Sequence, residues 1–218
     1  MHIHPSILSA DYANFARELA SISTADAAHV DVMDNHFVPN LTFGLGLVES
    51  LLKVTQLPLD IHLMIENPET WAPQYAEAGA ASVTFHLEAS REPVALARAL
   101  RALGARAAIA IKPNTPVSEV IELLPEIDML LIMTVEPGFG GQSLIQSTLE
   151  KVAQARSEIR GTGLEIGLQV DGGVTEDNIG ELAKLGADVF VAGSAVFKNP
   201  DRNAQISELR ALARAHAS

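Results

Sequence analysis

Cysteine is absent from the 218 residues of this chain. Disulfide bonds and thiolate metal ligands are therefore excluded, and any metal must be held by His, Asp, Glu or backbone oxygen atoms. Basic residues are few, since 15 Lys and Arg stand against 27 Asp and Glu, giving a formal net charge of −12. Nucleic acids and anionic membranes are bound by neutralising phosphates with Lys and Arg, so neither is expected as a partner.

Long apolar runs are also missing. Those present, such as residues 129–135, are far shorter than the roughly 20 residues of a membrane-spanning helix. The opening residues, MHIHPSILSAD, contain neither a basic leader nor an apolar signal core, so we expect a cytoplasmic protein. No low-complexity segment, charge run or composition shift divides the chain, and 48% of its residues are hydrophobic. We expect residues 1–218 to form a single domain.

Short β-rich segments alternate with segments of helical periodicity eight times. The predicted strands are residues 3–8, 28–33, 59–64, 82–86, 107–111, 129–134, 165–170 and 189–192. The predicted helices are residues 14–23, 46–54, 68–77, 93–103, 117–124, 147–159, 177–185 and 202–216. Near-continuous apolar strands such as MLLIM are typical of parallel sheets covered by helices. The pattern predicts an α/β protein with a (β/α)₈ TIM barrel, because the glycine fingerprint of an open doubly wound sheet is missing after the first strand.

Polar residues gather where these strands end, which is where barrel enzymes carry their functional groups. Strand side chains alternate between faces, so His29 and Asp31 share one face of their strand. His62 lies near the end of the third strand, and Asp171 follows the seventh. Two imidazoles and two carboxylates suit a divalent ion such as Zn²⁺, Fe²⁺, Mn²⁺ or Co²⁺. For any one of these residues alone, a hydrogen-bonded place in the core is the alternative.

The two carboxylates have a second use. Asp31 and Asp171 come from distant strands, so they can lie on opposite faces of a substrate, where one removes a proton and the other returns one. That arrangement inverts a stereocentre. A metal beside them would stabilise the enediolate that forms when a proton leaves the carbon next to a ketone.

Glycine-rich segments follow the last three strands: Gly138-Phe139-Gly140-Gly141, Gly172-Gly173 and Gly193-Ser194. Glycines in these loops let backbone N–H groups approach an anion. The three segments together predict a phosphorylated substrate, whereas any one of them alone can simply form a turn.

Other candidates end strands as well. The three methionines Met33, Met64 and Met133 either cap the reaction centre or, as we favour, fill the core. His86 ends the fourth strand. Lys112 ends the fifth and could form an imine, although a lysine at the rim commonly extends to solvent.

Seven segments resemble the ribulose-phosphate 3-epimerase family of the pentose phosphate pathway, in family order and over almost the whole chain. They are PSILSAD (5–11), HVDVMDNHFVPNLTFG (29–44), DIHLMIENP (60–68), VTFHLEA (83–89), MTVEPGFGGQ (133–142), VDGGV (170–174) and VAGSAVF (191–197). The resemblance implies a TIM barrel that interconverts D-ribulose 5-phosphate and D-xylulose 5-phosphate, with one divalent metal ion bound by His29, Asp31, His62 and Asp171. It also implies that Asp31 accepts a proton and Asp171 donates one, with the roles exchanged in the reverse direction.

The same resemblance implies substrate contacts. Ser9 and His62 would contact the sugar, and the three methionines would line the site. The phosphate would lie among the glycine-rich loops, at Gly138, Phe139, Gly140, Gly141, Gly172, Gly173, Gly193 and Ser194. One departure is Asn35, which stands where the family usually has glycine. Asparagine tolerates a left-handed backbone best after glycine, so we expect the turn to persist.

Other functions remain open at this point. An epimerase acting on a ketohexose 6-phosphate of the allulose 6-phosphate type would need the same chemistry. A lyase on the same scaffold would be a metal-dependent decarboxylase or an aldolase using Lys112. A non-catalytic phosphosugar sensor is disfavoured, because it has no use for a proton donor opposite a proton acceptor. The expected partners are a phosphorylated ketose and further copies of the chain in a homo-oligomer.

Overall fold

The computed structural model describes residues 1–217 and contains eight strands that alternate with helices. The strands are β1 (His2–Pro5), β2 (Ala28–Met33), β3 (Leu59–Met64), β4 (Ser82–His86), β5 (Arg106–Ile111), β6 (Met129–Met133), β7 (Gly167–Asp171) and β8 (Val189–Ala192). The α-helices are α1 (Phe15–Ala20), α2 (Leu45–Leu51), α3 (Pro68–Ala78), α4 (Pro93–Ala102), α5 (Thr148–Thr162), α6 (Ile179–Lys184), α7 (Ser194–Phe197) and α8 (Arg202–His216). The 3₁₀ helices are η1 (Ile7–Ser9), η2 (Tyr12–Asn14), η3 (Leu87–Ala89), η4 (Val117–Glu119) and η5 (Ile121–Glu126).

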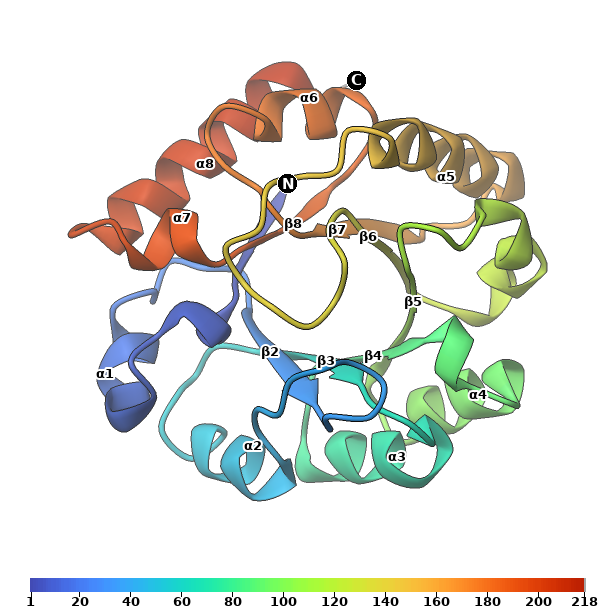
Figure 1. The fold of residues 1–218 in the computed structure, drawn as a ribbon, viewed down its shortest axis with the longest axis horizontal. Helices are drawn as coiled ribbons and strands as arrows, with labels where there is room; N and C mark the ends of the chain where they lie inside the picture. The colour runs from blue at the N-terminus through green and yellow to red at the C-terminus, as the bar shows by residue number, and fades with distance from the viewer. Residues whose placement is uncertain (218) are drawn as a thin grey trace.

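The strands form a parallel barrel surrounded by helices. Figure 1 looks along the barrel, with the strands in a ring and the helices outside it. The strand order is β1-β8-β7-β6-β5-β4-β3-β2, with parallel pairing throughout the ladders. A parallel bridge between Ser6 and His29 joins the two ends of this order. The predicted α/β class and TIM barrel are confirmed.

Alternation along each strand separates the apolar core from the polar interior. Ile61 and Leu63 of β3 are fully buried in the main hydrophobic cluster that the helices cover. His62, between them, faces the barrel interior instead. The helices present matching apolar faces, as α4 does with Leu96 and Leu100. Burial on both faces of the strands explains their near-continuous apolar composition.

Two predicted elements differ most from the structure, while several others shift by a few residues at their ends. The predicted strand 3–8 ends at Pro5, and the 3₁₀ helix η1 follows, with the Ser6 hydroxyl accepting a hydrogen bond from the Leu8 amide at 3.3 Å. The predicted helix 117–124 is instead a pair of 3₁₀ turns, η4 and η5. Pro125 lies inside η5. In an α-helix, proline would lack the N–H that donates to the carbonyl four residues earlier, and its ring would clash with that carbonyl.

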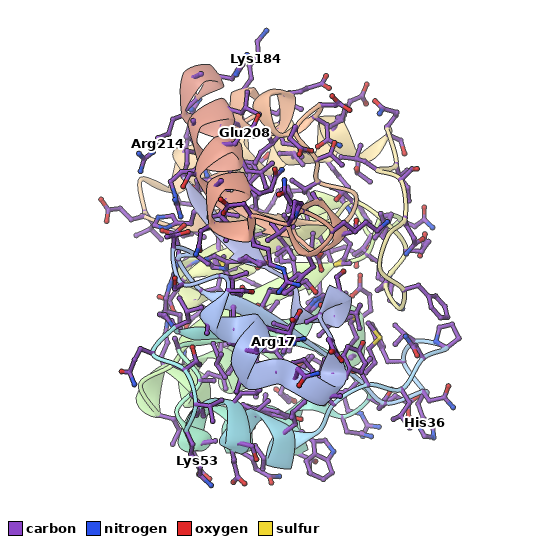
Figure 2. The ribbon with its side chains drawn as sticks, turned by 90° about the vertical axis from the view of Figure 1, so that its left-hand side faces the viewer. Arg17, His36, Lys53, Lys184, Glu208 and Arg214 are labelled. Carbon is purple, nitrogen blue, oxygen red and sulfur yellow. The ribbon has the colours of Figure 1, made fainter. Side chains whose placement is uncertain are left out.

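The loops that follow the strands gather at one end of the barrel. Figure 2 views the molecule from the side, and His36, in the loop after β2, projects at the same end as the loop after β6. The two loops are joined by a hydrogen bond of 2.8 Å from the side-chain NH₂ group of Asn40 to the Gly138 carbonyl. Within residues 1–217, no helix combines the length and the apolar character needed to cross a bilayer.

Candidate active site

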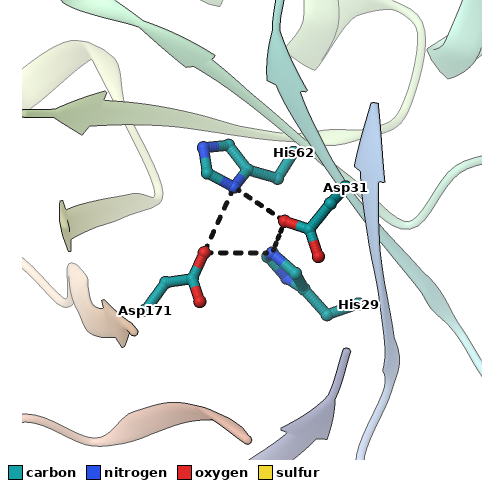
Figure 3. A group of neighbouring side chains, drawn as sticks. All are labelled: His29, Asp31, His62 and Asp171. Atoms are coloured by element: carbon teal, nitrogen blue, oxygen red, sulfur yellow. Dashed lines mark ion pairs between the residues drawn. The ribbon is translucent and has the colours of Figure 1, made fainter. Parts of the chain in front are cut away.

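Two histidines and two aspartates meet at the loop end of the barrel. His29 and Asp31 lie on the inner face of β2, His62 lies beside Asp31 on β3, and Asp171 ends β7. Figure 3 shows the imidazoles and carboxylates alternating around a small space. Asp31 Oδ1 lies 3.3 Å from both His29 Nε2 and His62 Nδ1. Asp171 Oδ2 lies 3.7 and 3.4 Å from the same two nitrogens.

These four side chains fit a divalent metal ion. Their ligand atoms all lie within 4.8 Å of one another. Ligand atoms about 2.0–2.2 Å from a tetrahedral ion lie about 3.3–3.6 Å apart, close to the measured separations. His29 Nε2 and His62 Nδ1 are buried and have no hydrogen-bond partner, which is costly unless an ion satisfies them. The cluster can therefore hold a metal ion.

Opposite charges dominate the electrostatics of the cluster. Burial disfavours the charged form of Asp31, but His29 and His62 outweigh it and hold the pKa of the Asp31 carboxyl below its ordinary value. Burial likewise opposes a charge on His29, but Asp31 and Asp60 raise the pKa of its imidazole well above the usual range. Asp31 is thus a carboxylate at neutral pH, and a metal would replace protons on the imidazoles.

Ser6 is a site residue that the sequence did not predict. Its hydroxyl donates a hydrogen bond of 2.5 Å to Asp31 Oδ2, the oxygen that faces away from the imidazoles. Barrel closure explains the contact, because the bridge between Ser6 and His29 brings the end of β1 beside β2. Ser6 thereby fixes which oxygen of Asp31 faces the two imidazoles.

We expect Ser6→Ala to lower kcat by about 10- to 100-fold, since a hydrogen bond to a charged group contributes about 1.5–3 kcal/mol. Steady-state kinetics would measure the change, and thermal unfolding would check that the variant is folded. A wild-type kcat would show that Ser6 does not position Asp31.

The buried carboxylate of Asp60 contacts Nδ1 of His29, the ring nitrogen that faces away from Asp31 and Asp171. Asp60 Oδ2 lies 2.9 Å from His29 Nδ1 and 2.8 Å from His4 Nδ1, and it accepts a hydrogen bond of 2.7 Å from Gln169. Burial opposes ionisation, but His29 and His4 hold the pKa of Asp60 well below its ordinary value. Because a carboxylate only accepts, Nδ1 of His29 carries a proton and Nε2 is free for a ligand role.

The second nitrogen of His62 has a different partner. His62 Nε2 lies 3.0 Å from Nε2 of His86, and His86 Nδ1 lies 3.1 Å from Oε2 of Glu88. Burial lowers the pKa of His86 to about 4, with Glu88 opposing it. Burial would raise the pKa of Glu88, but the hydrogen bond from His86 and others lower it to about 2. His86 is therefore neutral and Glu88 ionised at pH 7.

A pocket of about 460 Å³ opens above the cluster, a volume typical of small-molecule sites. The predicted site residues that line it are Ser9, Asp31, Met33, Met64, Met133, Gly138, Phe139, Gly140, Gly141, Asp171, Gly172, Gly173, Gly193 and Ser194. His29 and His62 lie beneath them and are fully buried. The structure thus brings the three glycine-rich loops and the two aspartates to one cavity.

Two further predictions concern the rim. Asn35 has a φ of 59°, so asparagine does adopt the left-handed backbone expected at that turn. Lys112 is not among the residues that line the pocket, and its Nζ lies 3.8 Å from the centre of the Phe37 ring. The imine chemistry of an aldolase therefore finds no support in this geometry.

Comparison with known proteins assigns the chain to a family. The sequence profile described as the Ribulose-phosphate 3 epimerase family matches residues 2–197. The chain belongs to the ribulose-phosphate 3-epimerase family. A protein of Mycobacterium tuberculosis (strain ATCC 25618 / H37Rv) named Ribulose-phosphate 3-epimerase is 54% identical over 208 residues, which cover 95% of this chain and 91% of that protein. A protein of the same name from Escherichia coli (strain K12) is 44% identical over 211 residues, covering 95% and 94%.

Solved structures similar to this epimerase-family chain share its fold at low sequence identity. KGPDC from Streptococcus mutans matches with a TM-score of 0.75 and 13% identity, covering 100% of this chain and 99% of that one. The 3-hexulose-6-phosphate synthase from Salmonella typhimurium matches with a TM-score of 0.70 and 18% identity, covering 99% and 100%. At such identities, these matches support the barrel alone.

Proposed function

We propose that this protein interconverts D-ribulose 5-phosphate and D-xylulose 5-phosphate by proton transfer at carbon 3. The observation that carries the proposal is the pair of carboxylates, Asp31 and Asp171, which come from β2 and β7 and line one pocket in a chain of this family. Each carboxylate contacts the same two imidazoles, so both are held within reach of one bound substrate.

Inversion follows from having two proton-transfer groups. Asp31, ionised at neutral pH, takes the proton from carbon 3 on one face of the substrate. Asp171 gives a proton to the other face, and the two residues exchange roles in the reverse direction. The Ser6 hydroxyl holds Asp31 during both transfers. Met33, Met64 and Met133 line the pocket without offering an exchangeable proton, which favours exclusion of water from the planar intermediate.

We propose that one divalent ion, which is Zn²⁺, Fe²⁺, Mn²⁺ or Co²⁺, is held by His29, Asp31, His62 and Asp171. When bound, such an ion supplies positive charge that stabilises the oxyanion developing as the proton leaves. The histidines would bind it through His29 Nε2 and His62 Nδ1, the two buried nitrogens without hydrogen-bond partners.

The phosphate would be held by backbone groups. No Lys or Arg is among the described residues that line the pocket, and we propose the N–H groups of the glycine-rich loops and the hydroxyls of Ser9 and Ser194 as donors. These loops also pack closely. Gly173 has a φ of +68°, and a Cβ added there would lie 2.4 Å from the Leu144 amide nitrogen in the loop after β6.

We therefore expect Gly173→Ala to raise KM at least about 10-fold, because the added methyl separates two phosphate-binding loops. We also expect it to lower the free energy of unfolding by about 1–2 kcal/mol, because alanine is strained in a left-handed backbone. Kinetics and chemical denaturation would measure both effects. Gly161→Ala is the matched control, since Gly161 lies in α5 with open space around its Cβ position. A KM unchanged by Gly173→Ala would remove these loops from the phosphate site.

The proposed activity is tested directly by incubating the purified protein with D-ribulose 5-phosphate in D₂O. Epimerisation should produce D-xylulose 5-phosphate with deuterium at carbon 3, detected by NMR. A product without deuterium at that carbon, or no product, would contradict the proposal. A higher kcat/KM on a ketohexose 6-phosphate than on the pentose would assign the longer sugar instead.

The remaining expectations belong to the same proposal. We propose a cytoplasmic homo-oligomer that binds a phosphorylated ketose and has no nucleic-acid or membrane partner, in keeping with its net charge of −12. Cell fractionation would test the location, and light scattering of the purified protein would test the assembly.

A further inference from the structure

A chain of buried hydrogen bonds connects His62 to a carboxylate that lies outside the metal cluster. His62 contacts His86, and His86 contacts Glu88, at 3.0 and 3.1 Å. His62 and His86 are fully buried, and the ring of Phe37 packs on His86 with centroids 4.7 Å apart. Glu88 lies in η3, directly after β4, and is absent from the residues that line the substrate pocket.

The direction of each hydrogen bond in this chain is determined by Glu88. A carboxylate only accepts, so Nδ1 of His86 must carry a proton. A neutral imidazole has one N–H and one bare nitrogen, so Nε2 of His86 accepts from Nε2–H of His62. The neutral form of His62, which is the form that binds a metal, then has its bare nitrogen at Nδ1, the nitrogen that faces Asp31 and Asp171.

We propose that Glu88 is a positioning residue that acts through His86 to keep His62 in the metal-binding tautomer. This inference rests on the proposed metal-dependent function. Glu88 does not touch the four proposed ligands, yet its carboxylate, which can only accept a hydrogen bond, selects through His86 which nitrogen of His62 would be free for the ion. Partners of this kind typically change metal affinity by about 10- to 100-fold when they are mutated.

The substitution Glu88→Gln separates this role from simple packing. Oε1 of Glu88 accepts hydrogen bonds from the Lys112 backbone amide, at 2.7 Å, and from the Thr115 hydroxyl. The Lys112 amide can only donate, so the glutamine oxygen must remain there and its NH₂ group must face His86. His86 Nδ1 would then have to accept, which reverses both histidine tautomers and places a proton on His62 Nδ1.

The test is Zn²⁺ affinity, measured by competition with a chelating dye, together with long-range ¹H–¹⁵N spectra of histidine-labelled, metal-free protein. We expect Glu88→Gln to weaken Zn²⁺ binding by about 10- to 100-fold and to move the His86 proton from Nδ1 to Nε2. Glu69→Gln is the matched control, because Glu69 also holds loop amides, those of Arg91 and Glu92. It should bind Zn²⁺ as the wild type does.

His86→Phe provides a second variant if Glu88→Gln does not fold. It keeps a ring in the same space but cannot accept from His62, so we expect a similar loss of Zn²⁺ affinity. Wild-type affinity in either folded variant, or an unmoved proton on His86 in Glu88→Gln, would overturn the inference alone. A wild-type protein that fails to bind Zn²⁺ would overturn the metal-dependent function and this inference with it.

Discussion

Asp171→Asn is expected to lower the interconversion of the two pentulose phosphates by about 10²–10⁴-fold while still allowing measurable hydrogen exchange at carbon 3 of one of them. The amide cannot deliver a proton, so inversion stops. Asp31 can still remove the carbon 3 proton of the epimer that faces it and return a deuteron to the same face. In D₂O, one epimer should therefore gain deuterium at carbon 3 without changing its configuration, which NMR detects.

Asp31→Asn should give the mirror result, with exchange confined to the other epimer. Asp201→Asn is a suitable control, because Asp201 caps α8 through the Ala204 amide and asparagine caps a helix as well as aspartate does. Interconversion at the wild-type rate in Asp171→Asn, or exchange of both epimers in one variant, would rule out proton transfer by two carboxylates.

Removal of the metal with a chelator is expected to lower kcat at least about 10²-fold, because the charge stabilisation of an ion is worth several kcal/mol. Adding back Zn²⁺, Fe²⁺, Mn²⁺ or Co²⁺ should restore activity. The ion should also stabilise the fold by about 4 kcal/mol at 1,000 times its Kd. For a chain of this length, that corresponds to a rise in Tm of about 8–16 °C.

The control for chelation is His62→Gln, which lacks one ligand and should show a much smaller rise in Tm when the metal is added. Elemental analysis would confirm that the treated protein holds no metal. Full activity of such metal-free protein would show that the four-residue cluster has another purpose.

Much of the barrel follows from local rules. The bounds of β2, β3, β4 and β8 agree with the predicted ranges, because β8 is an apolar run and the other three alternate between apolar and polar residues. Errors arose where local chemistry competes with periodicity. Residues 117–124 have helical spacing, but Pro125 favours 3₁₀ turns over an α-helix. The pattern predicts a strand that ends at residue 8, whereas β1 ends at Pro5, because the hydrogen bond from the Leu8 amide to the Ser6 hydroxyl is not visible in the periodicity.

The sequence by itself determined the barrel, its glycine-rich loops and the set of His29, Asp31, His62 and Asp171. Alternation along a strand and the convergence of parallel strand ends are local properties, so they are readable without coordinates. Only the tertiary structure decided which nitrogen of each histidine faces the two carboxylates and which groups contact its other nitrogen. Asp60, His86 and Ser6 contact the cluster because of their height along the barrel axis. Strand register and barrel closure set that height, and sequence spacing does not report it.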